Sequence, residues 1–120
     1  MPAPYIKSQS TKLYTLVLDL DETLLHYFEK NDYEGELRIR PGADDFLKLL
    51  SDHYEIVIFT AAMQDYADWA LEHFEHKECI SYRLYRQHAL PFGGVYVKDL
   101  SRIGRDISKT IIVDNIAENF

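Results

Sequence analysis

One stretch near the N-terminus decides the expected fold: Leu13-Tyr14-Thr15-Leu16-Val17-Leu18-Asp19-Leu20-Asp21-Glu22-Thr23. Its first half is mostly apolar and is followed at once by acidic residues. That pattern is typical of a buried parallel strand whose carboxyl end opens onto a site. We therefore expect Asp19 and Asp21 to lie at the edge of a buried sheet.

The rest of the chain alternates between strand and helix patterns. Apolar runs indicate further strands at 55–60, 80–85, 95–97 and 110–113. Apolar residues at helical spacing predict a helix after Arg40-Pro41-Gly42 and a second one at 63–74. This alternation predicts an α/β domain with a mainly parallel central sheet flanked by helices.

Two segments lack the buried-strand and helix patterns of this core. Residues 27–39 are polar and turn-rich, and we expect a short hairpin there, inserted after the first strand. Residues 1–12 are polar with two prolines, and we expect a flexible N-terminal lead-in ahead of a domain covering 13–120.

Composition narrows the class of protein. The 120 residues carry 13 basic and 20 acidic side chains, a formal net charge of −7, which argues against nucleic acid as a partner. The single cysteine excludes a disulfide framework and a cysteine-rich zinc site, and it fits an intracellular, reducing compartment. No apolar run is long enough for a membrane span.

Polar residues follow three of the predicted buried strands. They are Asp19 and Asp21 after the first strand, Thr60 at the end of 55–60, and Asp114-Asn115 after the last. In open α/β sheets ligands bind outside the carboxyl ends of the strands, so one fold would bring these segments together.

The spacing of the acidic residues indicates a metal site. Asp19 and Asp21 lie so close that their carboxylates repel each other unless a cation lies between them. Oxygen ligands suit Mg²⁺. Asn115 can add a neutral oxygen, and Asp114 can be a further ligand or orient one.

The same residues suggest a reaction. Beside a metal, Asp19 can attack phosphorus and form an aspartyl-phosphate. Asp21 can protonate the leaving oxygen and then activate the water that hydrolyses the intermediate. Thr60 and Lys98 can bind the non-bridging phosphate oxygens, where negative charge must be stabilised.

Each of these residues also has a purely structural explanation. Thr60 can cap the helix that follows it. Lys98 can form a weak surface ion pair with Asp99. Asp114-Asn115 can be plain turn residues. Their combination at strand ends, in this order, favours the catalytic interpretation.

Several segments together resemble a known family. Residues 18–24 resemble the Asp-x-Asp-x-Thr signature of the haloacid dehalogenase superfamily. A fuller similarity, over about residues 13–120, is to the branch of phosphatases related to those acting on the RNA polymerase II C-terminal domain. It rests on Arg40-Pro41-Gly42, Phe59-Thr60-Ala61-Ala62, Tyr85-Arg86-Gln87-His88, Val97-Lys98-Asp99-Leu100-Ser101 and Val113-Asp114-Asn115.

The resemblance implies a haloacid dehalogenase-like fold and magnesium-dependent hydrolysis of phosphoserine or phosphothreonine in a phosphoprotein or phosphopeptide. It implies that Asp19 is the nucleophile and that Asp21 is the acid/base, with its backbone oxygen on the metal. Asn115 would be a metal ligand supported by Asp114. It also implies that Thr60 and Lys98 hold the phosphate, that Arg86 lies beside the substrate, and that the protein is nuclear or cytoplasmic.

Other functions stay open from the sequence. The short segment between Thr23 and Arg40 leaves specificity for the polymerase tail undecided, and residues 80–86 also resemble a mitochondrial inner-membrane translocase subunit that carries this domain. An import receptor with little catalysis, held at that membrane by upstream segments, is therefore an alternative, as is a small-molecule phosphatase of the superfamily. The chain ends at Phe120, before the last strand and helix that the family would supply, so we expect that part to be lacking.

Overall fold

The computed structural model describes residues 2–115. The strands are β1 (Tyr14–Leu18), β2 (Leu25–Glu29), β3 (Gly35–Ile39), β4 (Tyr54–Phe59), β5 (Tyr82–Leu84), β6 (Leu90–Phe92), β7 (Val95–Val97) and β8 (Thr110–Val113). The helices are α1 (Ala43–Leu50) and α2 (Gln64–Leu71), with short 3-10 turns at Lys77–Cys79, Arg86–His88, Leu100–Arg102 and Ile107–Lys109.

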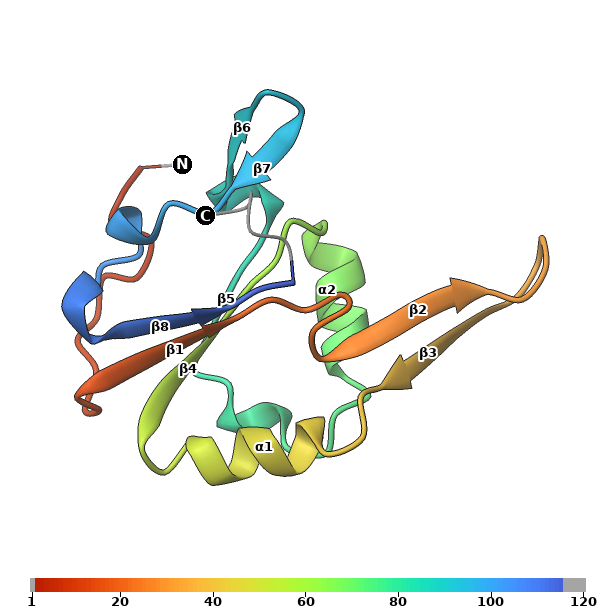
Figure 1. Ribbon diagram of the computed structural model, residues 1–120, viewed down its shortest axis with the longest axis horizontal. Coiled ribbons are helices and arrows are strands. Elements are labelled where there is room, and N and C mark those ends of the chain that lie inside the picture. Colours follow the sequence, from red (N-terminus) through yellow and green to blue (C-terminus); the bar gives the residue numbers. More distant parts are fainter. Residues whose placement is uncertain (1, 116–120) are drawn as a thin grey trace.

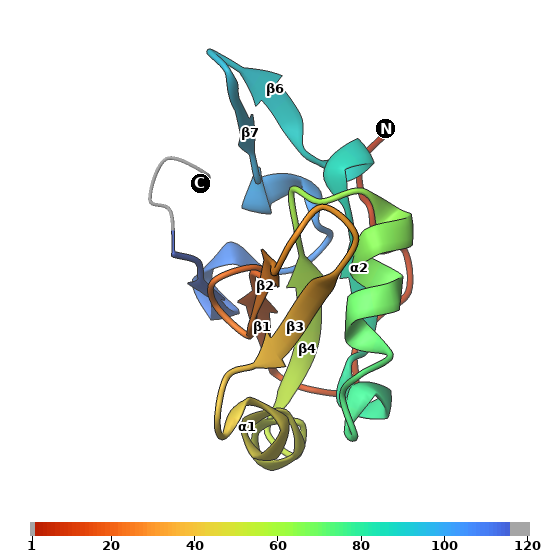
Figure 2. The same cartoon turned by 90° about the vertical axis from the view of Figure 1, so that its right-hand side faces the viewer.

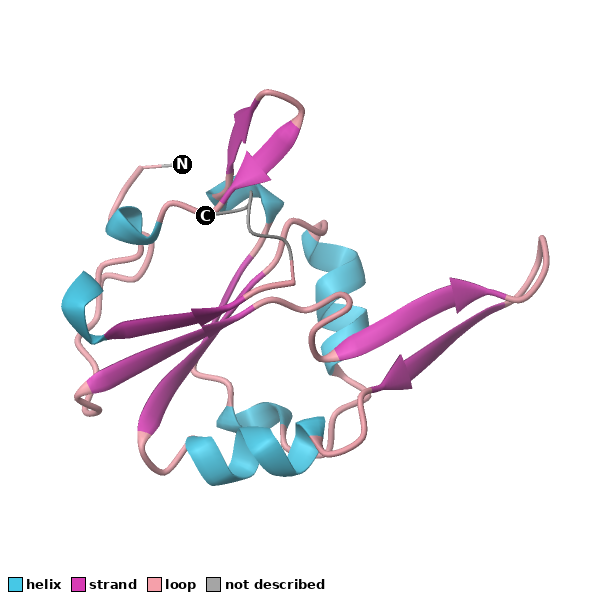
Figure 3. Cartoon of the chain, viewed as in Figure 1, coloured by secondary structure: helices cyan, strands magenta, loops and turns pink. Residues whose placement is uncertain are grey.

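The centre of the molecule is a four-stranded sheet in the order β5-β4-β1-β8 (Figures 1 and 3). All its neighbouring strands are parallel, with Leu18 opposite Ile58 on one side and Val113 on the other. The predicted α/β architecture with a mainly parallel sheet is thus confirmed. The register places the carboxyl ends of β1, β4 and β8 at one edge of the sheet.

Both helices cover the same face of this sheet. Leu16 and Leu18 of β1 belong to one buried cluster with Leu47 of α1 and with Ala67 and Leu71 of α2. The alternate residues of β1 and β4 point to the other face and are equally buried. This two-sided burial explains why the central strands read as continuous apolar runs.

Helix α2 ends at Leu71, short of the predicted end at residue 74. The chain turns there because the carboxylate of Asp44, in the first turn of α1, accepts hydrogen bonds from the backbone amides of Glu75 and His76, both at 2.9 Å. Phe74 is nevertheless buried in the helical face, which accounts for its place in the apolar pattern.

The N-terminal segment, for which the sequence predicts a flexible lead-in, contacts the sheet through a few residues. Ile6 is 4% exposed and packs on the second face of the sheet with Val17 and Phe59. The backbone amides of Tyr5 and Ile6 donate to the carbonyls of Arg102 and Ile103, both at 2.9 Å. Neither α1 nor α2 packs on this face, and Ile6 supplies part of its apolar cover.

Two antiparallel hairpins project from the sheet layer (Figures 1 and 2). The β2–β3 hairpin follows the first strand, where a short inserted hairpin was predicted. The β6–β7 hairpin has Gly93-Gly94 at its tip, and its first arm was not predicted because Leu90-Pro91-Phe92 is short and contains a proline. Within residues 2–115, no helix has the length and apolar character needed to cross a membrane.

Candidate active site

The carboxyl ends of three strands assemble the predicted site residues. The amide of Asp19, directly after β1, donates to the carbonyl of Val113 in β8 at 3.0 Å. The amide of Thr60, directly after β4, donates to the carbonyl of Leu84 in β5 at 3.0 Å. These bonds continue the parallel sheet pairing by one residue, so the sheet itself sets the position of Asp19 and Thr60.

Lys98 joins the ends of β1 and β8. Its ammonium group donates to Asp19 Oδ1 at 2.9 Å and to Asp114 Oδ2 at 2.5 Å, and the residue is only 1% exposed. The surface ion pair with Asp99 is not what the structure shows, because the Asp99 carboxylate accepts hydrogen bonds from the amide and hydroxyl of Ser101. Lys98 therefore lies inside the site, between two carboxylates.

Burial sets the electrostatics of Asp19. Removal from water raises the pKa of its carboxyl group, while the charge and hydrogen bond of Lys98 act in the opposite direction. The nearby Asp114 carboxylate adds to the rise. The balance leaves a desolvated carboxyl group next to one cation, which is a setting for a reactive group.

Asp21 lies on a tight turn after β1. Its neighbour Glu22 has a φ of +64°, a left-handed conformation that is strained for a residue with a side chain. The Asp21 carboxylate accepts a hydrogen bond from the hydroxyl of Tyr66, in the first turn of α2, at 2.6 Å. Burial, followed by the interaction with Asp21, raises the pKa of Tyr66, so its hydroxyl stays protonated and acts as the donor.

A cavity of about 470 Å³ lies over this edge of the sheet and is lined by most of the predicted site residues. They are Asp19, Asp21, Thr60, Arg86 and Asn115, with Glu22, Ala61, Ala62, Met63 and Tyr66. The structure thus brings together predicted residues from the turn after β1, the end of β4 and the end of β8.

Thr60 and Arg86 are both held in place around this cavity. Thr60 is 1% exposed, and its hydroxyl accepts from the amide of Ala62 at 3.0 Å, so it shapes the turn that leads into α2. The guanidinium group of Arg86 donates through Nε to the carbonyl of Ala61 at 2.7 Å and stacks over the ring of Tyr96 at 4.8 Å. Arg86 is therefore oriented by its neighbours, unlike an arginine exposed on the surface.

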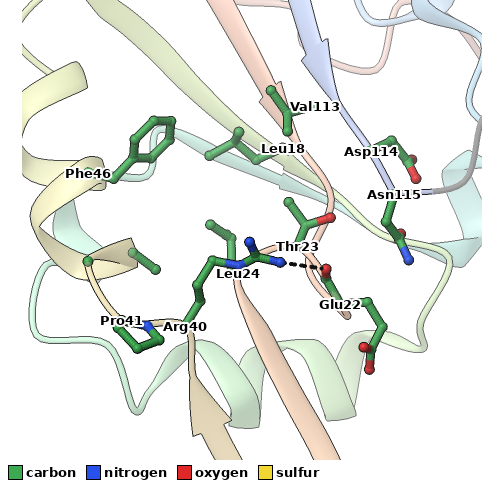
Figure 4. A pocket seen from close by; sticks show the side chains of 12 residues that line it. Leu18, Glu22, Thr23, Leu24, Arg40, Pro41, Phe46, Val113, Asp114 and Asn115 are labelled. Atoms are coloured by element: carbon green, nitrogen blue, oxygen red, sulfur yellow. Dashed lines mark hydrogen bonds between the residues drawn. The ribbon is translucent and has the colours of Figure 1, made fainter.

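A second cavity, of about 440 Å³, lies between the turn after β1 and the start of α1 (Figure 4). Leu18, Val113 and Phe46 line its apolar part, and Asp114 and Asn115 lie on the opposite side from Phe46 in the close-up. Arg40 donates to the carbonyl of Glu22 at 3.1 Å, and so ties the loop to the start of α1. This contact gives Arg40 of the Arg40-Pro41-Gly42 motif a role in holding the turn after β1.

The donor chemistry around the first cavity suits a hard cation. Carboxylate oxygens of Asp19 and Asp21, the amide oxygen of Asn115 and backbone carbonyls are the ligands that Mg²⁺ prefers. Among residues 2–115, no three histidine, cysteine, aspartate or glutamate side chains converge into a metal cage. A site of few protein ligands, completed by water and phosphate oxygens, matches this arrangement.

Comparison with known proteins identifies the family. A family model described as NLI interacting factor-like phosphatase matches residues 14–120. The chain belongs to the NLI interacting factor-like phosphatase family. The match covers the whole sheet and every element of the site, so the resemblance seen in the sequence motifs is confirmed.

Relatives within the family carry different names. CTD small phosphatase-like protein 3 of Caenorhabditis elegans is 40% identical over 135 residues, which cover 99% of this chain and 47% of that protein. The mitochondrial import inner membrane translocase subunit tim50 of Aspergillus fumigatus is 37% identical over 106 residues, covering 88% of this chain and 21% of that protein. The chain spans less than half the length of these relatives.

A solved structure confirms the fold. The fission yeast RNA polymerase II CTD phosphatase Fcp1, as the R271A variant bound to beryllium fluoride, matches with a TM-score of 0.73 at 18% identity, over 89% of this chain and 38% of that one. The haloacid dehalogenase-like fold of the NLI interacting factor-like family is therefore present here.

The hydrogen bond between Tyr66 and Asp21 was not predicted from the sequence. Tyr66 lies in the segment 63–74, which was predicted only as a helix with one apolar face, and its ring does contact the core. The available signal was position: a tyrosine in the first turn of a helix that follows a site-forming strand lies at the carboxyl edge of the sheet. Tyrosines there can direct a hydroxyl to the site and pack their ring inward.

Proposed function

We propose that this chain is a magnesium-dependent phosphatase domain that hydrolyses phosphoserine or phosphothreonine in proteins through an aspartyl-phosphate on Asp19. The observation that carries the proposal is the buried contact of Asp19 with Lys98 at 2.9 Å, in a cavity shared with Asp21 and Thr60. A nucleophile, a cation and a second carboxyl group meet there at the carboxyl edge of a parallel sheet.

Asp19 is suited to the role of nucleophile. The Lys98 ammonium group opposes the effect of burial and favours the charged carboxylate, which is the form that attacks phosphorus. One Asp19 oxygen is bound to Lys98, and the other would form the bond to phosphorus while the bond to the leaving oxygen breaks. The hydrogen bond from the Asp19 amide to β8 keeps this group in place during attack.

Positive charge for the transferred phosphate would come from several groups. Lys98 lies beside Asp19, and the hydroxyl of Thr60 can donate to a phosphate oxygen, because a hydroxyl that accepts one hydrogen bond keeps its own hydrogen. Asp19, the backbone oxygen of Asp21 and Asn115 would hold Mg²⁺, with Asp114 orienting Lys98 and supporting the metal site. When bound, the metal supplies charge that offsets the repulsion between carboxylates and phosphate.

Asp21 would move the protons. In the first step it would donate a proton to the oxygen that leaves with the serine or threonine side chain. In the second step it would take a proton from the water that attacks the aspartyl-phosphate, which frees the Asp19 carboxylate. It lines the same cavity as Asp19 two residues along the turn, so it can reach the opposite end of the transferred phosphate.

The substrate class is inferred from the relatives and from Arg86. Relatives that cover nearly the whole chain are named as phosphatases of the CTD small phosphatase group. Arg86 lies on the rim of the cavity, where its guanidinium can contact a peptide next to the phosphate. We infer a phosphoprotein or phosphopeptide substrate, and a nuclear or cytoplasmic location.

The test is turnover of p-nitrophenyl phosphate and of phosphoserine peptides by the chain, with Mg²⁺ and with EDTA. We expect activity that EDTA removes, and a loss of about 1000-fold or more for Asp19→Asn. Asp32→Asn, the same change at an exposed position of the β2–β3 hairpin, is the control and should be fully active. Turnover that survives both EDTA and Asp19→Asn would overturn the proposed mechanism.

The similarity to the tim50 relative supports a second candidate, a receptor domain at the mitochondrial inner membrane with little catalysis. The two functions predict opposite results with one pair of measurements. A receptor would bind positively charged presequence peptides and leave phosphopeptides uncleaved. A phosphatase would cleave phosphopeptides, and its binding of presequence peptides would be no tighter than that of scrambled sequences.

A further inference from the structure

One side chain from a distant element holds the carboxylate of Asp21. Tyr66 donates its hydroxyl hydrogen to Asp21 Oδ1 at 2.6 Å, across 45 residues of sequence. The bond connects the turn after β1 with the first turn of α2. Both residues line the same cavity, so this hydrogen bond lies within the site.

The ring of Tyr66 is itself braced by two other aromatic side chains. Tyr27 of the β2–β3 hairpin meets it edge to face, with ring centres 6.1 Å apart, and Trp69 lies 6.0 Å away on the same helix. Tyr27 and Trp69 also contact each other at 6.1 Å. Three rings in mutual contact restrict the rotamers of Tyr66, so its hydroxyl is directed at Asp21 before any substrate binds.

We propose that Tyr66 is the positioning residue for the acid/base carboxyl of Asp21. This inference rests on the proposed function. By occupying Oδ1, the Tyr66 hydroxyl leaves Oδ2 as the oxygen that carries the proton. Oδ2 gives that proton to the leaving oxygen as the phosphorus–oxygen bond breaks, and receives one from water as the bond between phosphorus and Asp19 breaks.

Two substrates whose leaving groups differ in their need for a proton can test this role of Tyr66. The oxygen of a serine side chain must be protonated as it leaves, whereas p-nitrophenolate is stable as an anion and needs little help. A group that acts through Asp21 therefore affects kcat/KM for a phosphoserine peptide more than for p-nitrophenyl phosphate. The ratio of the two values is independent of how much of a preparation is folded.

The variant is Tyr66→Phe, which keeps the ring and removes the hydroxyl. We expect kcat/KM for the phosphoserine peptide to fall about tenfold, and that for p-nitrophenyl phosphate by less than about threefold. In an Asp21→Asn background the same change should alter kcat/KM for the peptide by less than about twofold, because the two groups act as one unit.

Tyr85→Phe is the matched control, since the Tyr85 hydroxyl also donates to an aspartate, Asp68, at 2.7 Å and away from the reacting groups. It should leave the ratio of the two kcat/KM values unchanged. Equal losses on both substrates for Tyr66→Phe, no loss, or a full loss in the Asp21→Asn background would each overturn the role of Tyr66. A wild-type chain without Asp19-dependent turnover would overturn the proposed function, and this role with it.

Discussion

At the scale of single residues, the buried ammonium group of Lys98 is stabilised by two carboxylates. A buried charge is expensive unless it is paired and hydrogen-bonded, and Lys98 meets two carboxylates within 3 Å while it is 1% exposed. One lysine between Asp19 and Asp114 still leaves the trio with a net negative charge. That excess negative charge is the physical reason to expect a divalent cation when a phosphate dianion binds.

His88, another single residue, predicts how the stability of the fold depends on pH. Burial lowers the pKa of its imidazole, whose Nδ1 accepts from the amide of Tyr85 at 3.0 Å. The unfolded chain, with a histidine pKa of about 6.5, then binds the proton more readily than the folded chain. The stability that neutral His88 contributes is therefore complete above this value and is lost as the pH falls below it.

We expect the free energy of unfolding to decrease from pH 7 to pH 5, and to decrease less in His88→Asn. Asparagine offers a similarly placed acceptor to the Tyr85 amide but has no proton to gain in this range. Urea unfolding followed by circular dichroism at the two pH values measures the difference. An identical pH dependence in both proteins would show that His88 does not contribute to it.

At the scale of elements, the N-terminal segment covers part of the sheet face on which neither α1 nor α2 packs. Besides Ile6, it is held by Arg105, which donates to the carbonyl of Ser8 at 2.8 Å while forming a paired contact with the buried Glu55 at 2.6 and 2.8 Å. The segment also passes directly over Gly104. A Cβ on that glycine would lie 2.4 Å from the carbonyl oxygen of Ile6.

Gly104→Ala should therefore release the segment. The residue has a φ of +102°, so alanine is strained there and also collides with Ile6, and we expect a loss of about 2 kcal/mol in unfolding free energy. Hydrogen exchange at the amides of Tyr5 and Ile6 should become faster. Gly94→Ala is the control, with a φ of +85° but open space around it: it should lose about 1 kcal/mol and leave those two amides protected.

At the scale of the whole molecule, the sheet edge formed by β8 exposes apolar side chains. In the described part of the chain β8 pairs with β1 alone, and Ile111 and Val113 of β8 are 47% and 42% exposed. Leu49 of α1, on the same side of the sheet as these two residues, is 67% exposed. A strand edge with exposed apolar side chains is a template for association.

We expect the chain to self-associate as its concentration rises, and Ile111→Lys to reduce this, because a charged lysine opposes edge-to-edge pairing. Light scattering over a concentration series measures the effect. Ile107→Lys places the same charge at an isoleucine that is 55% exposed but lies outside the strand. Equal improvement by both variants would indicate a general effect of charge and argue against association through β8.

The sequence alone predicted the order of the central strands and helices and the polar residues that follow them. Apolar runs that end in acidic or polar residues are local patterns, and they identified β1, β4 and β8 together with Asp19, Asp21, Thr60 and Asp114-Asn115. The strand predictions are confirmed because a strand buried on both faces must be apolar throughout. The roles proposed for the polar residues next to these strands stay predictions.

Only the tertiary structure decided which groups touch. Lys98 contacts Asp19 and Asp114, 79 and 16 residues away, in place of its neighbour Asp99. Tyr66 donates a hydrogen bond to Asp21. Ile6 packs on the second face of the sheet, a contact that no local sequence pattern indicates. Such contacts follow from how strands and helices pack, and sequence separation carries no information about them.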